Sequence, residues 1–306
     1  IEADLVIVDE ASMLSLEICR HLLAAIGPDT HLVLIGDADQ LPPVGPGKPF
    51  CELIEAGVAP TVRLEHVFRQ ARRSMIVGAA HSIRRGERPR SEPAEEEVRD
   101  FFVHRRSSAQ ELAESVVRIA TERIPEQFDL DPVRQVQILA PQYRGPLGID
   151  HLHGAMREVL CGGAQRCLDG RFAIGEKVIT PRSLPEHGIA NGTLFVIDSD
   201  DEVNGELMLE SDLGELIAIP HREARSLRGA FCTSVHKAQG FEIPAVVVCL
   251  HGSHAPQLLS RNLLYTAVTR ARELCVLAGD DRAIGRALGN TEATDRFSRL
   301  IDRMSA

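Results

Sequence analysis

The sequence predicts an α/β fold of two parallel-sheet domains, the second interrupted by a small β-rich insert. Aliphatic runs alternate with helical patterns through the first 85 residues, and the same alternation returns after residue 100 and again after residue 230. Between these regions, residues 165–228 consist of short alternating segments punctuated by glycines, which is typical of an antiparallel barrel or meander. Regular alternation of strands and helices favours a doubly wound sheet, and 306 residues suffice for two domains.

Five segments predict the first domain. Residues 5–8, LVIV, form an unbroken aliphatic run, which is typical of a strand buried on both faces of a parallel sheet. A helical pattern over 15–26 leads to a second strand at 31–36. A helix over 49–57 has proline at its first turn and glycine at its end. An arginine-rich helix follows.

The second domain is predicted from four further aliphatic segments with helical patterns between them: FFVH, VQILAP, AVVVCL and LCVLAG. The stretch 87–97 is charged, contains proline and is almost free of apolar residues, so it is the best candidate linker. The predicted boundaries are 1–90 for the first domain, 91–180 and 229–290 for the second, 181–228 for the inserted barrel, and 291–306 for a C-terminal tail helix.

The charge pattern is uneven. A net charge of −10 argues against a general polyanion-binding protein, but the stretch from Arg63 to Arg90 contains eight arginines against two glutamates. This local patch could bind phosphates, or it could be a solvated basic helix beside an acidic linker. Charge alone leaves both interpretations open.

The seven cysteines are scattered and include no CxxC pair, which predicts reduced thiols in a cytoplasmic protein, with neither a disulfide framework nor a zinc site. The sequence has no apolar run long enough for a membrane span and no secretory leader pattern, so we expect no membrane partner.

Two adjacent carboxylates, Asp9 and Glu10, directly follow the first predicted strand. Ligands of parallel sheets bind at the carboxyl ends of strands, where such carboxylates can hold Mg²⁺ and polarise water. Alternatively, one of them could simply cap the next helix. The second strand ends in Asp37 and continues into a loop rich in proline and glycine, which places Gln40 at the same edge. Glutamine at that position can sense a phosphate.

Six ordered blocks resemble the motifs of the RecD-like branch of superfamily 1 helicases. They are DEAS with GDADQLPPVGPG (motifs II and III), LEHVFRQ (motif IV), ILAPQYRGPLGID (the RecD-type segment), TSVHKAQGFEIPAVVV (motif V) and NLLYTAVTRARE (motif VI). Because the blocks keep the family order over nearly the whole chain, the match is far more specific than any single motif.

The resemblance implies two RecA-like motor domains, the first incomplete here, that bind ATP and Mg²⁺ between them. It assigns Mg²⁺ to Asp9, the attacking water to Glu10, and γ-phosphate sensing to Gln40. Arg69 and Arg270 become arginine fingers, each worth about 10³–10⁵ in rate in a typical case. Taken alone, Arg270 could instead complement a helix C-terminus. The resemblance adds three nucleotide contacts, listed here: Asp37, Gly240 and Glu242.

The resemblance also implies 5′-to-3′ movement along single-stranded DNA. It predicts that the insert is a small barrel of the Src-homology-3 type that grips the strand. The candidate DNA contacts are Thr233, Ser234, His236, Lys237, Tyr143 and Arg144. Motif V could equally be only a capped helix start after a strand. Because the chain has no tryptophan and two tyrosines, we expect phosphate contacts to outweigh base stacking and affinity to fall steeply with salt.

One expected block is missing. No GxxxxGK[ST] run, the phosphate loop whose amides and lysine hold the nucleotide phosphates, occurs in the sequence. We therefore expect these residues to be a fragment that does not hydrolyse ATP alone. The leading hypothesis is part of an ATP-dependent DNA helicase acting in repair or recombination, with DNA ends and subunits of a recombination complex as partners. The alternatives are a non-catalytic DNA-binding subunit and the helicase part of a conjugative relaxase.

Overall fold

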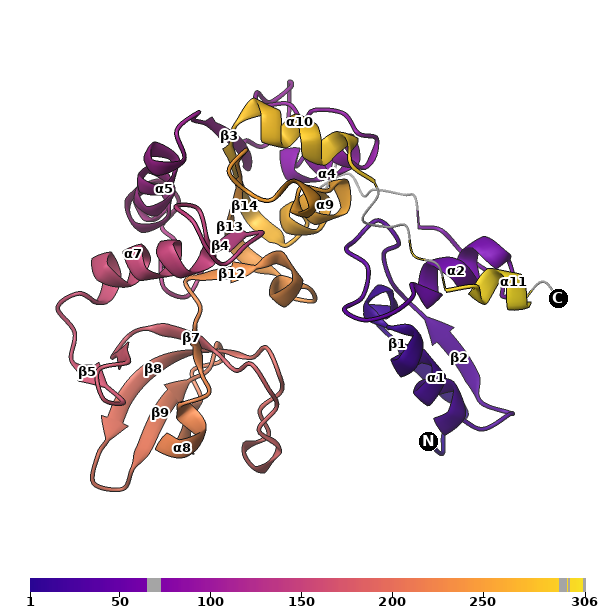
Figure 1. Cartoon of the computed structure of the whole chain (residues 1–306), viewed down its shortest axis with the longest axis horizontal. Coiled ribbons are helices and arrows are strands. Elements are labelled where there is room, and N and C mark those ends of the chain that lie inside the picture. Colours follow the sequence, from indigo (N-terminus) through magenta and orange to yellow (C-terminus); the bar gives the residue numbers. More distant parts are fainter. Residues whose placement is uncertain (65–72, 292–295, 297, 305–306) are drawn as a thin grey trace.

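The computed structural model describes residues 1–64, 73–291, 296 and 298–304 (Figure 1). The predicted motif IV, with its arginine finger Arg69, lies almost entirely outside the described residues. The description below therefore rests on the other five blocks.

The first unit is a two-stranded parallel sheet with helices. β1 (Leu5–Val8) pairs with β2 (His31–Leu34). The chain then forms η1 (Ala11–Met13), α1 (Leu16–Ala25) and α2 (Pro49–Ala56) around this sheet. Gly57 ends α2 in the left-handed conformation, at φ 64°. Glycine adopts this conformation without a steric penalty.

The prediction that β1 is buried on both faces is wrong for this structure. Leu5 and Ile7 are 51% and 58% exposed, whereas Val6 and Val8 between them are partly buried. Because successive side chains of a strand point to opposite faces, this alternation means that the described residues cover only one face of the β1–β2 sheet.

The second unit is built on a five-stranded sheet in the order β12–β4–β13–β14–β3, with every pairing parallel. This sheet confirms the predicted α/β class. Its strands are β3 (Phe101–Arg105), β4 (Val136–Ala140), β12 (Cys232–Ser234), β13 (Ile243–Leu250) and β14 (Ala271–Gly279). Alternate residues of β13 enter two separate cores: Val246 and Val248 face one, Ala245 and Val247 the other. Burial of this strand on both faces therefore explains why the run AVVVCL is apolar without interruption.

Helices cover both faces of this sheet (Figure 1). One face carries α5 (Ala109–Arg118), the π-helical segment η2 (Ile119–Arg123), α6 (Ile124–Phe128) and α7 (Ile149–Cys161). The other face carries α4 (Met75–Arg84), α9 (Arg261–Val268) and α10 (Asp281–Gly289).

Helix α4, which lies inside the arginine-rich stretch and ends at Arg84, belongs to the second unit by its packing, although the sequence boundary at residue 90 assigned it to the first. Ser74 caps α4 by accepting a hydrogen bond from the Val77 amide. Its apolar side chains, among them Ile76 and Ile83, join the core of α9 and the central sheet. Periodicity identified the apolar face of the helix but not the surface that this face covers.

The insert contains a five-stranded antiparallel sheet in the order β10–β9–β8–β7–β11. Its elements are β7 (Lys177–Ile179), η3 (Pro185–His187), β8 (Leu194–Asp201), β9 (Glu206–Glu210), β10 (Leu216–Pro220), α8 (His221–Ala224) and β11 (Arg228–Gly229). A hairpin of β5 (Arg166–Cys167) and β6 (Phe172–Ala173) shares its core, so the insert begins before the predicted residue 181. In the described sheet, β10 and β11 each pair with one other strand, so they form its two edges. Closure of this sheet into a barrel stays a prediction.

The C-terminal segment returns to the first unit (Figure 1). α11 (Leu300–Met304) packs against α2, Ser298 donates a hydrogen bond to Glu52, and Arg296 donates to the Gly45 and Gly47 carbonyls. Of the predicted tail helix 291–306, the described part is helical only at 300–304. Within the described ranges, no helix has the length and apolarity needed to cross a membrane.

Candidate nucleotide site and DNA groove

Asp9 and Glu10 lie at the carboxyl end of β1. Glu10 adopts the left-handed conformation at φ 50°, and its amide donates to Asp9 Oδ1 at 2.8 Å. The next α-helix, α1, is capped by Ser15, and the Glu10 side chain caps nothing in η1. The capping alternative for these carboxylates is therefore wrong: neither side chain caps the next α-helix.

Arg270 comes from the second unit and reaches Glu10 of the first. The guanidinium Nη1 lies 3.9 Å from Glu10 Oε1 and donates to the Phe241 carbonyl at 3.3 Å. The residue is only 6% exposed, and its Nε has no hydrogen-bond partner among the described residues. A buried guanidinium with an unused donor is costly unless a further anion satisfies it. The side chain thus reaches Glu10 across the boundary between the two units, which is called the seam below.

Gln40 lies in the loop that follows β2, and this loop is fastened to the second unit. The Leu41 amide donates to Thr266 Oγ1 at 2.8 Å, and Asn262 Nδ2 donates to the Asp39 carbonyl at 2.9 Å. On the other side, Gln239 Nε2 donates to the Leu41 carbonyl at 3.2 Å. These bonds hold the backbone beside Gln40, whose own Oε1 is buried without a partner among the described residues.

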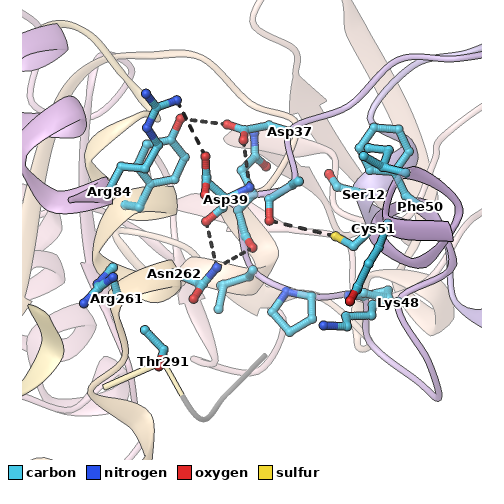
Figure 2. Close-up of a pocket in the computed structure, with 18 of the residues that line it drawn as sticks. Ser12, Asp37, Asp39, Lys48, Phe50, Cys51, Arg84, Arg261, Asn262 and Thr291 are labelled. Atoms are coloured by element: carbon cyan, nitrogen blue, oxygen red, sulfur yellow. Dashed lines mark hydrogen bonds and ion pairs between the residues drawn. The ribbon is translucent and has the colours of Figure 1, made fainter. Parts of the chain in front are cut away.

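Asp37, predicted as a nucleotide contact, is engaged elsewhere. Its Oδ2 accepts a hydrogen bond from the Tyr265 hydroxyl at 2.8 Å, and its Oδ1 accepts from the Asp39 amide at 2.9 Å. Burial, and then the nearby Asp37 charge, raise the pKa of Tyr265 well above its usual range, so the phenol stays a donor. Asp37 therefore joins the two units (Figure 2), and its contact with a nucleotide stays a prediction.

Gly240 and Glu242 lie beside Arg270. Gly240 has φ 79° and an added Cβ would meet nothing within 4 Å, so the conformation and not crowding favours glycine. Glu242 is exposed, and the carbonyl of Phe241 between them accepts the Arg270 hydrogen bond. This turn, Arg270 and Glu10 therefore form one neighbourhood.

A groove of about 730 Å³ separates the second unit from the inserted sheet. Five of the six predicted DNA contacts line it: Tyr143, Arg144, Thr233, Ser234 and Lys237. The sixth, His236, does not line the groove and is exposed. Partial desolvation, together with the Arg296 charge, lowers the pKa of its imidazole. Three further cations line the groove: Arg157 from α7, Arg171 from the β5–β6 hairpin and Arg228 from β11.

Sequence reasoning missed these three arginines because they belong to no quoted motif. It also missed the seam contacts Gln239, Asn262, Tyr265 and Thr266, although all four fall inside motif V or motif VI blocks. Their positions inside these motif blocks were the signal that could have identified them.

Comparison with known proteins agrees with this geometry. Residues 1–125 match an AAA domain family model, and residues 229–278 match the UvrD-like helicase C-terminal domain. Along 99% of its length, the chain is 35% identical to the ATP-dependent RecD2 DNA helicase of Deinococcus radiodurans. Along nearly its whole length, the chain resembles the RecD-like helicases.

Two further similarities accord with the RecD-like assignment. The RecBCD enzyme subunit RecD of Mycolicibacterium smegmatis is 28% identical over 93% of this chain. The chain spans 40% of the length of the RecD2 relative and 51% of this one. A Pif1 helicase from Bacteroides, solved in complex with ADP-AlF3 and single-stranded DNA, has the same fold: TM-score 0.55, 16% identity, 99% of this chain and 75% of that one.

Proposed function

We propose that this RecD-like chain forms the motor part of an ATP-dependent DNA helicase that moves 5′ to 3′ along single-stranded DNA in repair or recombination. The observation that carries the proposal is the reach of Arg270 across the seam to Glu10. A buried cation from one unit that faces carboxylates of the other is what a nucleotide-driven motor needs, because hydrolysis can then change how the units fit together.

The residues present fit ATP and Mg²⁺. In this proposal Asp9 holds the metal, Glu10 orients the attacking water, and the two orphaned groups, Gln40 Oε1 and Arg270 Nε, belong to the phosphate site. Bound Mg²⁺-ATP supplies the transferable phosphoryl group. Glu242 would hold the ribose beside Gly240. Arg69 stays a proposed second finger outside the described residues.

Hydrolysis also requires a phosphate loop that these 306 residues do not contain. We therefore expect the chain alone to bind DNA without turning over ATP. DNA-stimulated phosphate release by the 306-residue chain would overturn this part of the proposal.

The groove beside the inserted sheet is the proposed path of the strand. Its cations can neutralise backbone phosphates without reading sequence, which suits a motor that must pass every base. The proposal includes duplex ends as substrates, and other subunits of a recombination complex as partners, because one relative is a subunit of the RecBCD enzyme.

The decisive experiment measures DNA-stimulated ATPase in the complete helicase with its phosphate loop, for Asp9→Asn, Glu10→Gln and Arg270→Ala. We expect each change to abolish most turnover while strand binding at low salt persists. Retained turnover in all three would refute the site. A protein that binds the strand but never hydrolyses ATP would favour the alternative of a non-catalytic DNA-binding subunit.

A further inference from the structure

The chain passes between the second unit and the inserted sheet at two places, and polar groups hold both crossings. It enters the sheet at Lys177 of β7 and leaves it through β11 and Ala230. The Ala230 amide donates to the Lys177 carbonyl at 2.8 Å, so the two crossings lie side by side. From the second unit, the Val136 carbonyl accepts from Lys177 Nζ at 3.2 Å, and Gln137 Nε2 donates to the Ala230 carbonyl at 2.9 Å.

His153, on α7 of the second unit, contacts both crossings. At the entry, its Nε2 lies 3.1 Å from Oε1 of Glu176, the residue before β7. At the exit, its ring stacks on the Phe231 ring, with centroids 5.6 Å apart and planes at 22°. The ring also lies directly against Gly229, where an added Cβ would be 2.0 Å from Nε2. One side chain of the second unit therefore touches both ends of the insert.

The contact between His153 and Glu176 is almost closed to water. The Glu176 side chain is 0% exposed and the His153 side chain 16% exposed. The other carboxylate oxygen, Oε2, accepts from the Ala173 amide at 2.9 Å. His153 Nδ1 is buried without a partner among the described residues, so a proton there would be an unsatisfied donor. We therefore assign the ring hydrogen to Nε2, which donates to Glu176.

Loss of this donor would leave a buried carboxylate oxygen unpaired, which is costly. The insert is therefore held where Glu176 can reach the His153 ring. Gly229 adds a steric limit on the opposite crossing, because the strand can pack against the ring only without a side chain. A hydrogen bond and a close packing contact together restrict how the inserted sheet can sit on α7.

Cations of the groove lie on both sides of this contact. Arg157 follows His153 by one turn of α7, and both residues line the groove. On the insert, Arg228 belongs to β11, whose other residue packs against the ring. Arg171 Nη2 donates to the Leu227 carbonyl at 3.2 Å, just before β11. The distance between the cations of the two parts therefore depends on how the exit crossing sits against His153.

We propose that His153 is the positioning residue of the groove. It fixes the angle between the inserted sheet and the second unit, and so keeps Arg171 and Arg228 in line with Arg157 along one strand. The ring acts through Glu176 and Gly229 and needs no contact with the strand. The role in strand binding rests on the proposed path of DNA through the groove, whereas the role in holding the insert does not.

Spin labels test the positioning without DNA. Exposed label sites are Glu202→Cys, in the turn after β8, and Glu114→Cys on α5. All seven cysteines lie in the described part of the chain, and Cys51→Ser removes the one that is not buried. Double electron–electron resonance on the 306-residue chain should give one narrow distance distribution, which His153→Ala should broaden or shift. His153→Gln, which keeps an N–H donor near the Nε2 position, should retain it. An unchanged distribution in His153→Ala would overturn the proposal.

Gly229→Ala tests the same contact from the insert. Because the new Cβ would lie 2.0 Å from His153 Nε2, the ring and the strand cannot both keep their places, and the distribution should change. In the double variant with His153→Ala the clash is absent, so Gly229→Ala should add no further change. Gly154→Ala is the control on α7, since a Cβ there meets nothing within 4 Å. Additive effects of the two changes would contradict a direct contact.

Salt-dependent binding of oligo(dT) tests what the positioning does for the groove. His153→Ala should lower the slope of log affinity against log salt by about 1.4, the value for two lost phosphate contacts on a single strand. In that variant Arg228→Ala should lower the slope no further, because its phosphate contact is already lost. Arg157→Ala should still lower it by about 0.7. Fluorescence anisotropy over a salt series measures these slopes.

The results distinguish this inference from the proposed function. A parent chain that does not bind oligo(dT) would contradict the proposed path of the strand, while the spin-label distances still decide whether His153 holds the insert. A parent chain that binds, with the same slope in His153→Ala, would contradict the positioning role in the groove. Cooperative urea unfolding shows that a variant is folded, and Gly229→Ala carries the test where His153→Ala does not fold.

Discussion

The seam between the two units and the groove beside the inserted sheet are both polar, but they are built in different ways. At the seam, hydrogen bonds pair specific residues of the two units: Thr266 accepts from the Leu41 amide and Tyr265 donates to Asp37, whereas Gln40 Oε1 and Arg270 Nε have no partner among the described residues. In the groove, five cations face a wide channel, where Asp150 and Glu176 are the acidic residues among the described lining. The seam is therefore suited to transmit a small movement, and the groove to hold a sliding polyanion.

This difference predicts which substitutions should have large effects and which should have small ones. A seam of buried, paired groups loses much when one partner is removed, because the other is left unsatisfied. A groove of exposed or partly exposed cations loses little per residue, because each phosphate contact is weak and screened by salt. The predictions below test that contrast, from the largest expected effect to the smallest.

Arg270→Ala should lower DNA-stimulated ATPase of the complete helicase by about 10³-fold or more, the loss typical of an arginine finger. Arg272→Ala is the matched control, because Arg272 is exposed and pairs only with its neighbour Glu273 in the described contacts. Equal turnover in the two variants would remove Arg270 from the site.

Lys177→Met should change stability in a pH-dependent way. Lys177 is the first residue of β7 in the inserted sheet and is buried. Its Nζ donates to the Val136 carbonyl at 3.2 Å, and burial lowers its pKa to about 8. Because its ordinary value is 10.5, the unfolded chain binds more protons between about pH 8 and 10.5, and this residue's contribution to stability rises with pH there.

Below pH 8 the burial of Lys177 therefore costs about 3 kcal/mol, which methionine would remove. Urea unfolding at pH 7 and pH 10 measures the difference between the variant and the parent chain. The variant should be the more stable at pH 7, and its advantage should shrink at pH 10. An advantage independent of pH would show that the lysine is not titrating as described.

Thr266→Ala should destabilise the chain by about 1–3 kcal/mol, because the buried Leu41 amide loses its acceptor. Thr269→Ala is the control at the end of the same helix, since its hydroxyl donates only to the Thr266 carbonyl in the described contacts. Urea unfolding compares the two. If both changes lowered the free energy of unfolding equally, the hydrogen bond from the Leu41 amide to Thr266 would contribute no more than the bond that Thr269 makes.

Arg157→Ala or Arg228→Ala should each reduce affinity for oligo(dT) modestly. Each should also lower the slope of log affinity against log salt by about 0.7, the value for one phosphate contact on a single strand. Fluorescence anisotropy over a salt series measures this slope, with Arg222→Ala as the control. A slope unchanged in both groove variants would place the strand elsewhere.

The sequence predicted the fold correctly where a local pattern of apolar residues matched the surfaces that are present to bury them. The run AVVVCL was predicted as part of the α/β pattern, and the structure shows a strand covered on both faces. The same logic failed for LVIV, because a pattern states what a strand is able to bury and not what is present to cover it. Likewise, the apolar face of α4 was visible in the sequence, but its partner helix α9 lies almost 180 residues later.

The site could be predicted where a strand end or a motif indicated it. The ends of two predicted strands indicated Glu10 and Gln40, motif order added Arg270, and the structure brings Arg270 to Glu10. The bond from Leu41 to Thr266 joins residues 225 positions apart and has no local pattern. Nothing in the sequence distinguishes Arg157, Arg171 and Arg228 from ordinary surface cations. Only the folded insert brings them to one groove.

The central claim is that Glu10 and Arg270, from two units, act on one bound nucleotide. A double-mutant cycle on ATPase turnover of the complete helicase tests it most directly, with Glu10→Gln, Arg270→Ala and the pair. Residues that act as one unit give strongly non-additive losses, so the double variant should be little slower than the slower single variant. Losses that simply multiply would show that the two side chains serve separate sites, and would contradict the account.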